Sequence, residues 1–584
     1  MNECGEITMF RLKPLKSSTV PLKWVVVHFD GNNTTCAFCT CKNEEWKVLP
    51  QLIGGPANLE YIASQVRTKE ITWLVGEGLY EWLCSQDLYR QIVAGKASLP
   101  LGNSNSNMGK LTGQFATGDP CIIDLVFEGK RLHCIDFGNW GIHDVKSIDH
   151  AVQSLRDYVR MVSDLDMGTI KSTAAAQGAA RFRSRDIDDH RIYCHQVPEV
   201  RRLERDAFYG GRAECLTLGQ VDGTVYDLDA VSMHPTIGLE EKFPVKLIDL
   251  SPFPANERLL KHYRAGRHIF ARVKLRTPSP DYPVRMKLPG GGERTWTIYP
   301  TGEFETVLPG PEFAHALESD RIIEVKEWAA YDTARIFKEN SEWFFDIKDR
   351  LEPLGLSHMK DCLKLAQNAF YGNMGRRGRR WINGIKWHDA EWGMWWGRHP
   401  VIGNVVAWRA IAGVHQYLDS GGEPETSCPA ISATMFSYCR VRLLAYIQTA
   451  GRENTHYYDS DGLAVNCKGA VKLHSRHNEL RIKKQSDDVE FRGIKYYRFD
   501  DVWTHAGVPT WAERLPDGSA RFPRHEPFNF GMWHAMPFQH KYILAANDPF
   551  PKYRHGIVAH GGRVSPFVLP FKEKIDGSNE KKEK

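Results

Sequence analysis

The stretch THYYDSDGLAV, residues 455–465, constrains the fold more than any other segment of the chain. An aromatic, β-rich run leads into Asp459, Ser460, Asp461 and Gly462, and a second apolar run follows. Asp, Ser and Gly all favour turns, so the pattern predicts a β-hairpin with two carboxylates at its tip. The stretch alone is compatible with an ordinary polar turn and with a metal site, and only the rest of the chain distinguishes them.

The length and composition are those of a multidomain globular protein. The 584 residues predict roughly four domain-sized units. The net charge of +5 permits nucleic-acid binding without requiring it. No stretch approaches the ~18 consecutive apolar residues of a membrane span, and the N-terminus lacks the apolar core of a signal peptide. We therefore expect a cytoplasmic protein with no membrane partner.

The cysteines indicate a reducing compartment rather than a disulfide scaffold. The 13 cysteines show no regular framework. The densest group, CAFCTC, has no second CxxC or His pair nearby at the spacing of a zinc site. We therefore expect Cys36, Cys39 and Cys41 to be buried thiols of a β-strand, in preference to a zinc site.

Patterns along the chain predict its main elements. The first part alternates strand-like and helix-like signals, which indicates an α/β domain. Within it, WVVVHFD (24–30) predicts a buried strand, 121–137 a hairpin and 149–165 a helix. Residues 240–335 are rich in Pro and Gly and predict an irregular insertion with short strands. Residues 338–371 have a helical pattern.

One predicted helix, KDCLKLAQNAFYG at 360–372, carries an unusual set of side chains. At ~100° per residue, Lys360, Lys364, Asn368 and Tyr371 share one helix face. Two cations, an amide and an aromatic ring suit a polyphosphate with a base stacked nearby. An ordinary solvated helix face is the alternative interpretation.

A third acid completes a candidate metal site. Asp229 lies near the end of a β-branched run in GTVYDLDAVSMHP, 223–235. With Asp459 and Asp461 it offers oxygen ligands for two divalent cations, Mg²⁺ or alternatively Mn²⁺, whose shells substrate phosphates would complete. Two such ions promote in-line phosphoryl transfer. The acids, the lysines and the tyrosine together predict a nucleotidyltransferase.

In order and wording, these three motifs resemble the palm and fingers signatures of family B DNA polymerases. DAVSMHP resembles the first palm motif, KLAQNAFYG the fingers motif and YYDSD the second palm motif. The resemblance implies that Asp229, Asp459 and Asp461 are catalytic and that Asp229 and Asp461 bind the metals. The nucleotide-binding residues that it implies are Lys360, Lys364, Asn368, Tyr371 and His234.

The motifs also depart from the family pattern. His234 replaces the tyrosine that stacks under the incoming sugar, so discrimination against ribonucleotides is an open question. Ala369 replaces the serine that follows the fingers asparagine.

Two flanking segments extend the resemblance, and a basic run adds a candidate DNA contact. FYGGRAE (208–214) resembles the segment that joins exonuclease and polymerase domains, and IKYYRF (494–499) resembles the element that holds the primer strand. RRGRRW (376–381) is a basic run suited to template phosphates. The competing interpretations are a plain turn, an exposed strand pair and a solvated loop. The primer- and DNA-binding residues expected on these segments are Tyr209, Gly210, Gly211, Lys495, Tyr497, Arg376 and Arg377.

The implied fold is an α/β and α+β multidomain chain, in which a right-hand polymerase of palm, fingers and thumb follows an N-terminal RNase H-like exonuclease-type domain. The size and the long insertion resemble the protein-primed branch of phages and linear plasmids. The expected divisions are 1–185 for the exonuclease-like domain, 186–240 for the first part of the palm, 241–337 for an insertion resembling the terminal-protein-contact region, 338–378 for the fingers, 379–427 for a second insertion, 428–502 for the second part of the palm, and 503–584 for the thumb and C-terminal tail.

The N-terminal domain lacks several acids of a proofreading site. In FDGNN, Asp30 is present, but Asn32 stands where the family has glutamate, and an amide lacks the charge that a second metal needs. Asp157 fits the last acid of the family, whereas Gln153 occupies the place of its tyrosine partner. We expect Asp30 and Asp157 to be remnants of a degenerate site with weak or absent 3′–5′ exonuclease activity.

The favoured function is that of a template-directed DNA polymerase that adds dNTPs to a primer 3′-hydroxyl. Its partners would be template and primer DNA and dNTPs, and a terminal protein is a candidate source of the priming hydroxyl. One alternative is a catalytically weak nucleic-acid-binding replication or defence factor on a polymerase scaffold. The other is a primer-independent polymerase or primase. The three acids argue against a pure binding module, because clustered negative charge repels DNA phosphates.

Overall fold

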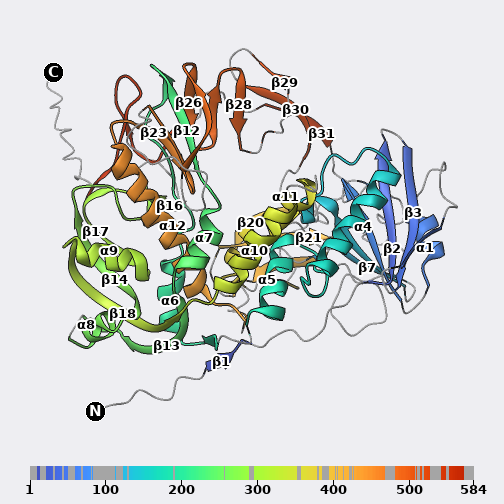
Figure 1. Cartoon of the computed structure of the whole chain (residues 1–584), viewed down its shortest axis with the longest axis horizontal. Helices are drawn as coiled ribbons and strands as arrows, with labels where there is room; N and C mark the ends of the chain where they lie inside the picture. Colours follow the sequence, from blue (N-terminus) through green and yellow to red (C-terminus); the bar gives the residue numbers. More distant parts are fainter. Residues whose placement is uncertain are drawn as a thin grey trace, which may run out of the picture.

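The structure is a computed structural model. It describes residues 9–12, 21–30, 33–42, 45–49, 59–67, 70–79, 82, 112–113, 123–127, 130–187, 191–254, 257–288, 295–351, 357–377, 380–383, 393–401, 403, 405–411, 414–419, 424, 426–466, 480–506, 508, 513–515, 519–526, 541–546 and 552–570. The N-terminal sheet and the sheet of the long insertion lie at opposite ends of the long axis, with helices α10 (Lys338–Leu351) and α11 (Ser357–Asn373) between them (Figure 1).

A seven-stranded sheet forms the N-terminal domain, and its central strands β2, β5 and β8 run parallel. In sheet order, its strands are β4 Glu45–Leu49, β3 Asn33–Lys42, β2 Lys23–Asp30, β5 Ile71–Gly76, β8 Lys130–Asp136, β7 Ile123–Phe127 and β6 Thr112–Gly113. The strand at 24–30, the hairpin within 121–137 and the α/β character of this region are thereby confirmed.

Helix α4 (Ile148–Asp164) packs on this sheet and confirms the helix predicted at 149–165. It begins where the Ser147 side chain accepts a hydrogen bond from the His150 N–H. Its Tyr158 ring stacks on Trp140 of the 3₁₀ turn η1 (Phe137–Trp140), with ring centroids 4.4 Å apart. The described part of this region also contains helices α1 Leu59–Gln65 and α5 Ala174–Arg185.

The three clustered cysteines lie on β3, as predicted. Cys36 and Cys39 are each 1% exposed and Cys41 is 4% exposed. Burial raises the pKa of the Cys36 and Cys39 thiols to about 11, so both stay protonated at neutral pH. These residues behave as small apolar side chains of the sheet.

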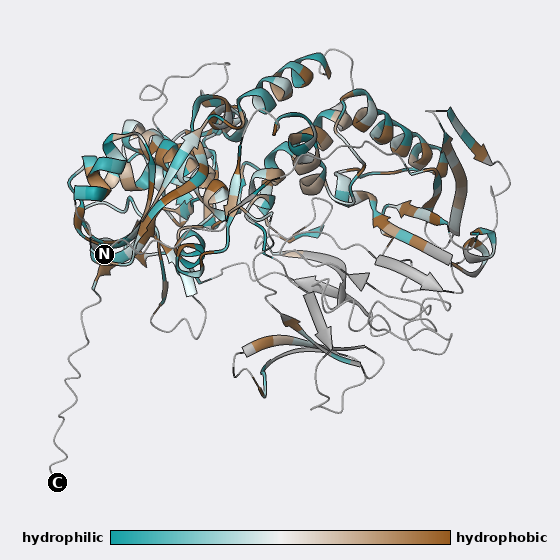
Figure 2. Ribbon diagram, turned by 90° about the horizontal axis from the view of Figure 1, so that it is seen from below, coloured by the Kyte–Doolittle hydropathy of each residue, from teal (hydrophilic) through white to brown (hydrophobic). Residues whose placement is uncertain are grey.

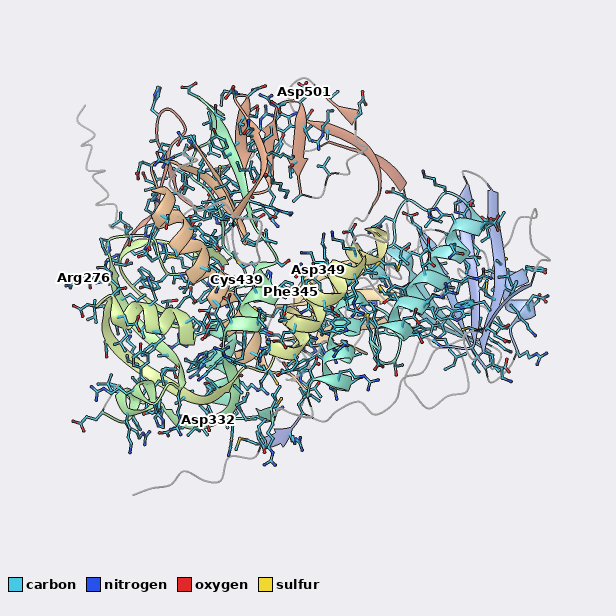
Figure 3. The ribbon with its side chains drawn as sticks, in the orientation of Figure 1. Arg276, Asp332, Phe345, Asp349, Cys439 and Asp501 are labelled. Carbon is cyan, nitrogen blue, oxygen red and sulfur yellow. The ribbon has the colours of Figure 1, made fainter. Side chains whose placement is uncertain are left out.

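A five-stranded sheet lies in the central part of the chain. In sheet order it contains β10 Ala213–Cys215, β23 Thr455–Asp459, β24 Gly462–Val465, β12 Val225–Ala230 and β25 Leu480–Ser486. The core beneath it includes side chains from α7 (Met233–Glu240), α11 and α12 (Pro429–Ala450). Cys439 on α12 and Phe345 on α10 lie near the centre of the molecule, whereas Arg276 and Asp501 lie at its periphery (Figure 3).

The insertion is more regular than its composition predicts. Instead of short strands in an irregular segment, it contributes four strands, of which β18 has 13 residues and β14 has 10, to a five-stranded sheet that β34 completes from the C-terminal part of the chain. Pro244 lies in the edge strand β13 beside a register shift, where a missing N–H costs least. Pro309 caps the following helix α9. The strands and helices are β13 Phe243–Ser251, β18 Ile322–Ala334, β14 His268–Thr277, β17 Thr301–Leu308, β34 Val568–Leu569, α8 Glu257–Arg264 and α9 Gly310–Glu318.

Smaller sheets complete the described part of the chain. Two have four strands, in the orders β19-β22-β21-β20 and β11-β26-β27-β28. The first consists of β19 Arg380–Asn383, β22 Val414–Asp419, β21 Val405–Ile411 and β20 Gly393–Arg398. The second consists of β11 Gly219–Val221, β26 Val489–Gly493, β27 Tyr496–Phe499 and β28 Val502–His505. The others are β1 Met9–Arg11 with β9 Tyr193–His195, β15 Val284–Lys287 with β16 Thr295–Ile298, β29 Glu513–Arg514 with β30 Ala520–Glu526 and β31 Lys541–Ala546, and β32 Ile557–Val558 with β33 Val564–Ser565; helix α6 is Pro198–Asp206.

Hydrophilic and hydrophobic residues are interspersed along the helices, as in elements with one buried face (Figure 2). Among the helices in the described part of the chain, none combines the length and the apolar character needed to cross a membrane.

Candidate active site

The central sheet brings the three predicted acids to one end. Asp229 on β12 lies opposite Gly462 of β24, and Asp459 is the last residue of β23. Asp461 lies in the turn between β23 and β24, which confirms the hairpin predicted at 455–465. The Ala230 N–H donates to the Asp461 carbonyl at 2.7 Å. Two segments more than 200 residues apart in sequence thus place their carboxylates at a common edge.

The turn between the two acids is tight. The Asp461 N–H donates to the Asp459 carbonyl at 2.6 Å, and the intervening Ser460 has φ of 54°. A positive φ at a residue other than glycine is strained and persists only where the surroundings enforce it. Here the Ser460 N–H donates to the Arg212 carbonyl at 2.7 Å, which fixes the turn from the neighbouring strand.

Burial and mutual repulsion perturb the acids. Burial, followed by the charges of Asp229 and Asp459, raises the pKa of Asp461 to about 6. Burial also raises the pKa of Asp227, which precedes Asp229 by two residues on β12. The carboxylates are therefore close enough to disfavour one another's ionisation, a condition that a bound cation relieves.

Two basic side chains already contact the acids. Arg481 of β25 lies 3.0 Å from Asp229 Oδ2, and Lys495 Nζ lies 3.3 Å from Asp459 Oδ2. Sequence reasoning did not identify Arg481. The sequence pattern that could have identified it is the alternation of apolar and basic residues in LRIKKQS (480–486), which places Arg481 and Lys483 on one face of a strand.

The donor set fits Mg²⁺ only with help from a substrate. Within the residues that the structure describes, no group of three or more His, Cys, Asp or Glu side chains is arranged to hold a metal ion. Mg²⁺ is commonly bound by one or two carboxylates, with substrate phosphates and water completing the octahedron. Asp229 and Asp461 supply a donor set of that kind.

The four residues that were predicted to share one face of α11 differ in their exposure to solvent. Lys360 and Lys364 are partly exposed and Asn368 is exposed, but Tyr371 is fully buried. All four residues lie on α11, as predicted, but their exposure differs, because Tyr371 packs in the core at the C-terminal end of the helix. The Tyr371 hydroxyl accepts a hydrogen bond from Gln367 Nε2 at 2.8 Å.

Tyr371 nevertheless meets another predicted site residue. Its ring is stacked on His234 of α7, with centroids 6.1 Å apart and planes 18° from parallel. Phe436 of α12 meets the same imidazole edge-on at 5.8 Å. Burial lowers the pKa of His234 to about 4, so the imidazole is neutral at neutral pH.

A further cation approaches the first palm-like motif from α10. Lys348 Nζ donates to Ser232 Oγ at 3.0 Å, and Ser232 has φ of 55°. The partner lies 116 residues away in sequence, so no local pattern could have predicted this contact.

The predicted primer-contact segment lies against the hairpin turn. A Cβ on Gly211 would lie 2.6 Å from Ser460 Oγ, so a side chain there would displace the Ser460 hydroxyl. Gly210 has φ of 78°, and its carbonyl accepts a hydrogen bond from Arg440 Nη1. The hydroxyl groups of Tyr209 and Thr306 share a hydrogen bond of 2.8 Å, in which either oxygen can be the donor.

The other predicted DNA contacts lie on different elements. Tyr497 of β27 packs on Tyr457 of β23, with ring centroids 5.2 Å apart. Lys495 precedes β27 and has φ of 55°. Arg376 and Arg377 are exposed just beyond α11.

The residues of the degenerate exonuclease site are described only in part. Asp30 ends β2, but its side chain and Asn32 lie outside the described residues. Asp157 lies on α4, where its Oδ1 accepts a hydrogen bond from Gln153 Nε2 at 2.7 Å. Gln153 thus partners Asp157 directly, and a proofreading role for either acid stays a prediction.

The fold as a whole is that of a DNA polymerase. It is similar to Phi29 DNA polymerase bound to primer-template DNA and incoming nucleotides, with a TM-score of 0.59 and 12% identity over 90% of this chain and 100% of that chain. The complex of the same enzyme with primer-template DNA alone gives a TM-score of 0.56 with 11% identity over 90% and 100% of the two chains. Its complex with single-stranded DNA gives 0.52 with 12% identity over 84% and 90%.

This likeness confirms, at the level of the fold, the predicted resemblance to DNA polymerases. No protein-family model matches the chain, and neither does any curated protein.

Proposed function

We propose that the protein is a template-directed DNA polymerase that adds dNTPs to a primer 3′-hydroxyl. The observation that carries the proposal is the meeting of Asp229, Asp459 and Asp461 at one edge of the central sheet. These acids come from the two motifs that resemble the palm signatures, and the fold around them is similar to that of a DNA polymerase. The raised pKa of Asp461 supports the proposal, because perturbed acids cluster at functional sites.

The residues of the chain have separate proposed tasks. Lys364 and Lys360 on the partly exposed side of α11 neutralise the triphosphate as it binds. The neutral His234 and the buried Tyr371 form the floor on which the incoming sugar and base rest. Gly210, Gly211 and Lys495 lie next to the acids, where the primer end must be held.

Asp229 and Asp461 would hold the divalent cations, assisted by Asp459. When bound, such ions activate the attacking hydroxyl and stabilise the charge that develops on the leaving phosphate. Mg²⁺ is the expected ion, and Mn²⁺ is an alternative. In the metal-free protein, the positive charge of Arg481 offsets part of the negative charge of Asp229.

The test is nucleotide incorporation on a primed template with Mg²⁺ and labelled dNTPs. We expect extension by the wild type and a loss of at least about 10³-fold in Asp461→Asn, since this change removes a metal ligand but keeps the side-chain volume. Asp487→Asn is the matched control, because Asp487 is an exposed acid just beyond β25 on the same sheet. Undiminished synthesis by Asp461→Asn would refute the assignment.

The same assay separates the alternatives. A binding factor retards primer-template DNA in a gel without incorporating nucleotides at any metal concentration. A primer-independent polymerase or primase incorporates dNTPs or NTPs on unprimed template. Extension that requires a terminal protein would appear only after that protein is added.

We further propose that 3′–5′ exonuclease activity is weak or absent. Metal-dependent trimming of a mismatched primer by the wild type, lost in Asp30→Ala, would contradict this.

A further inference from the structure

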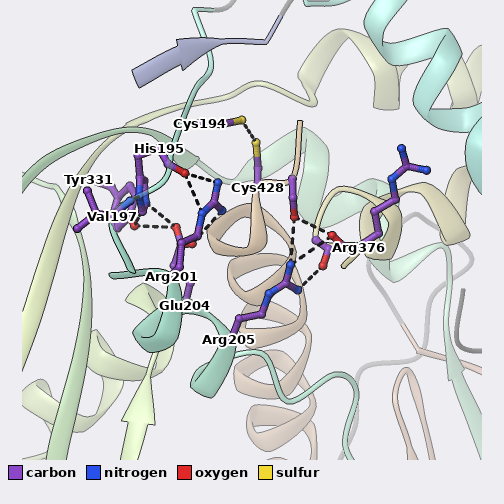
Figure 4. A network of polar contacts seen from close by, with 11 residues as sticks. Cys194, His195, Val197, Arg201, Glu204, Arg205, Tyr331, Arg376 and Cys428 are labelled. Carbon is purple, nitrogen blue, oxygen red and sulfur yellow. Dashed lines mark hydrogen bonds and ion pairs between the residues drawn. The ribbon is translucent and has the colours of Figure 1, made fainter. Parts of the chain in front are cut away.

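Two cysteines distant in sequence meet in the interior, away from the acids. Cys194 lies on β9, and Cys428 immediately precedes α12. Their sulfur atoms are 2.6 Å apart and the residues are 234 positions apart in the chain (Figure 4). The two side chains therefore approach closely without any local constraint of sequence, and disulfide formation requires such an approach.

The environment makes Cys194 the nucleophile of the pair. A hydrogen bond from the Cys428 thiol, with the charges of Arg201 and Arg183, holds the pKa of Cys194 below its ordinary value, although burial opposes this. The pKa of Cys428 is raised, first because its thiol donates to Cys194. Burial raises the pKa of Cys439, on the same helix as Cys428, to about 12. Cys194 is therefore the more readily ionised of the two thiols, and two adjacent thiols with unequal pKa values suit redox chemistry.

The surroundings of the pair give its oxidation a structural consequence. Arg183, whose charge lowers the pKa of Cys194, lines a cavity of about 260 Å³ together with Met374 and Thr426. The Cys428 N–H donates to the Met374 carbonyl at 2.7 Å, so the same residue holds the end of α11. Nearby, Arg205 donates to the carbonyl of Gly375 and to Ser427 Oγ (Figure 4).

We propose that Cys194 and Cys428 are a modification site, at which hydrogen peroxide forms a reversible disulfide that fastens the start of α12 to β9. The Cys194 thiolate attacks a peroxide oxygen and the O–O bond breaks, which leaves a sulfenic acid and one water. The Cys428 sulfur then attacks the Cys194 sulfur and the S–O bond breaks, which releases a second water. Two thiols are oxidised by two electrons in total, and one peroxide is reduced to two waters.

The experiment treats the folded full-length chain with hydrogen peroxide, blocks the remaining thiols and maps tryptic peptides without reduction. Cys194 lies in peptide 192–201, and peptide 410–440 contains both Cys428 and Cys439. Cys439→Ala is therefore the background that assigns the link to Cys428, and it also controls for loss of a buried thiol. We expect the cross-linked pair of peptides in the wild type and in Cys439→Ala, and its loss after treatment with dithiothreitol.

Two further variants test the order of events. Cys428→Ala should accumulate sulfinic acid on Cys194, because no second thiol resolves the sulfenic acid. Cys194→Ala should leave Cys428 reduced at the same peroxide concentration. Serine replaces alanine if either variant fails to give a cooperative melting curve.

The outcomes decide the proposal in either direction. A link that forms in the folded wild type, with a midpoint of thermal unfolding raised by several degrees that dithiothreitol reverses, supports it. A link that forms only after the protein is unfolded overturns it. So does oxidation of Cys428 in Cys194→Ala at the wild-type rate. Polymerase activity enters none of these measurements, so the result is independent of the proposed function.

Discussion

The guanidinium of Arg481 donates to Oδ2 of Asp229 at 3.0 and 3.3 Å through two of its nitrogens. If Asp229 is a metal ligand, the metal and the guanidinium compete for the same oxygen. Arg481→Gln should therefore lower the Mg²⁺ concentration that gives half-maximal incorporation by about 2- to 5-fold, the range expected for a partly exposed ion pair. The measurement is a Mg²⁺ titration of primer extension. Arg276→Gln, which breaks an exposed pair with Glu303, should leave the titration unchanged.

The raised pKa of Asp461 predicts a pH dependence of the metal-free protein. The folded state keeps the proton between the ordinary value of 3.8 and about 6, where the unfolded chain has lost it. Stability therefore falls as the pH rises through this window, and the cost, about 3 kcal/mol, is fully present above pH 6. Asp461→Asn in EDTA should unfold at a higher urea concentration than the wild type at pH 7.5, and the difference should vanish near pH 4. An equal difference at both pH values would contradict the prediction.

Lys364 should act on the nucleotide and not on the DNA. It is partly exposed on α11, and its ammonium lies 3.6 Å from Asp361. Loss of a charged contact to phosphate costs about 1.5–3 kcal/mol, so Lys364→Ala should raise the KM for dNTP by roughly 10- to 100-fold. Binding of primer-template DNA without nucleotide should be unaffected. Lys338→Ala, at an exposed lysine on α10 that pairs with Glu342, is the matched control.

The ion pair between Arg440 and Glu312 should be essential for folding. Arg440 Nε donates to Glu312 Oε1 at 2.8 Å, and the side chains are 1% and 2% exposed. Glu312→Ala leaves the guanidinium buried without its carboxylate, so the free energy of unfolding should fall by about 3–5 kcal/mol. Asp346→Ala breaks the exposed pair with Arg350 on α10 and should cost less than about 1 kcal/mol. Urea denaturation of both variants gives the comparison.

The elements that the sequence predicted correctly depend on local chemistry. The hairpin at 455–465 follows from two β-rich runs around Asp, Ser and Gly, and the strand at 36–41 follows from small apolar thiols. The prediction that the insertion is irregular was wrong, because its prolines lie in an edge strand and at the start of a helix. The composition of a segment does not show where along its strands and helices such residues lie.

The candidate site divides in the same way. The acids were recognisable from their motifs, whereas Arg481 and Lys348 touch partners 252 and 116 residues away, which only the tertiary fold reveals. The burial of Tyr371 could not be predicted, because angular spacing along a helix does not show where the helix enters the core.

The strand order of the central sheet has a consequence for biosynthesis. β12, which carries Asp229, pairs with β24 and β25, and the latter begins at Leu480. A nascent chain that has not yet emerged from the ribosome as far as residue 480 cannot complete the sheet around its acids. The N-terminal sheet, whose strands all lie within the first 136 residues, has no such dependence. Translation itself thus separates the two regions in time, and the acids come together only when most of the chain has been made.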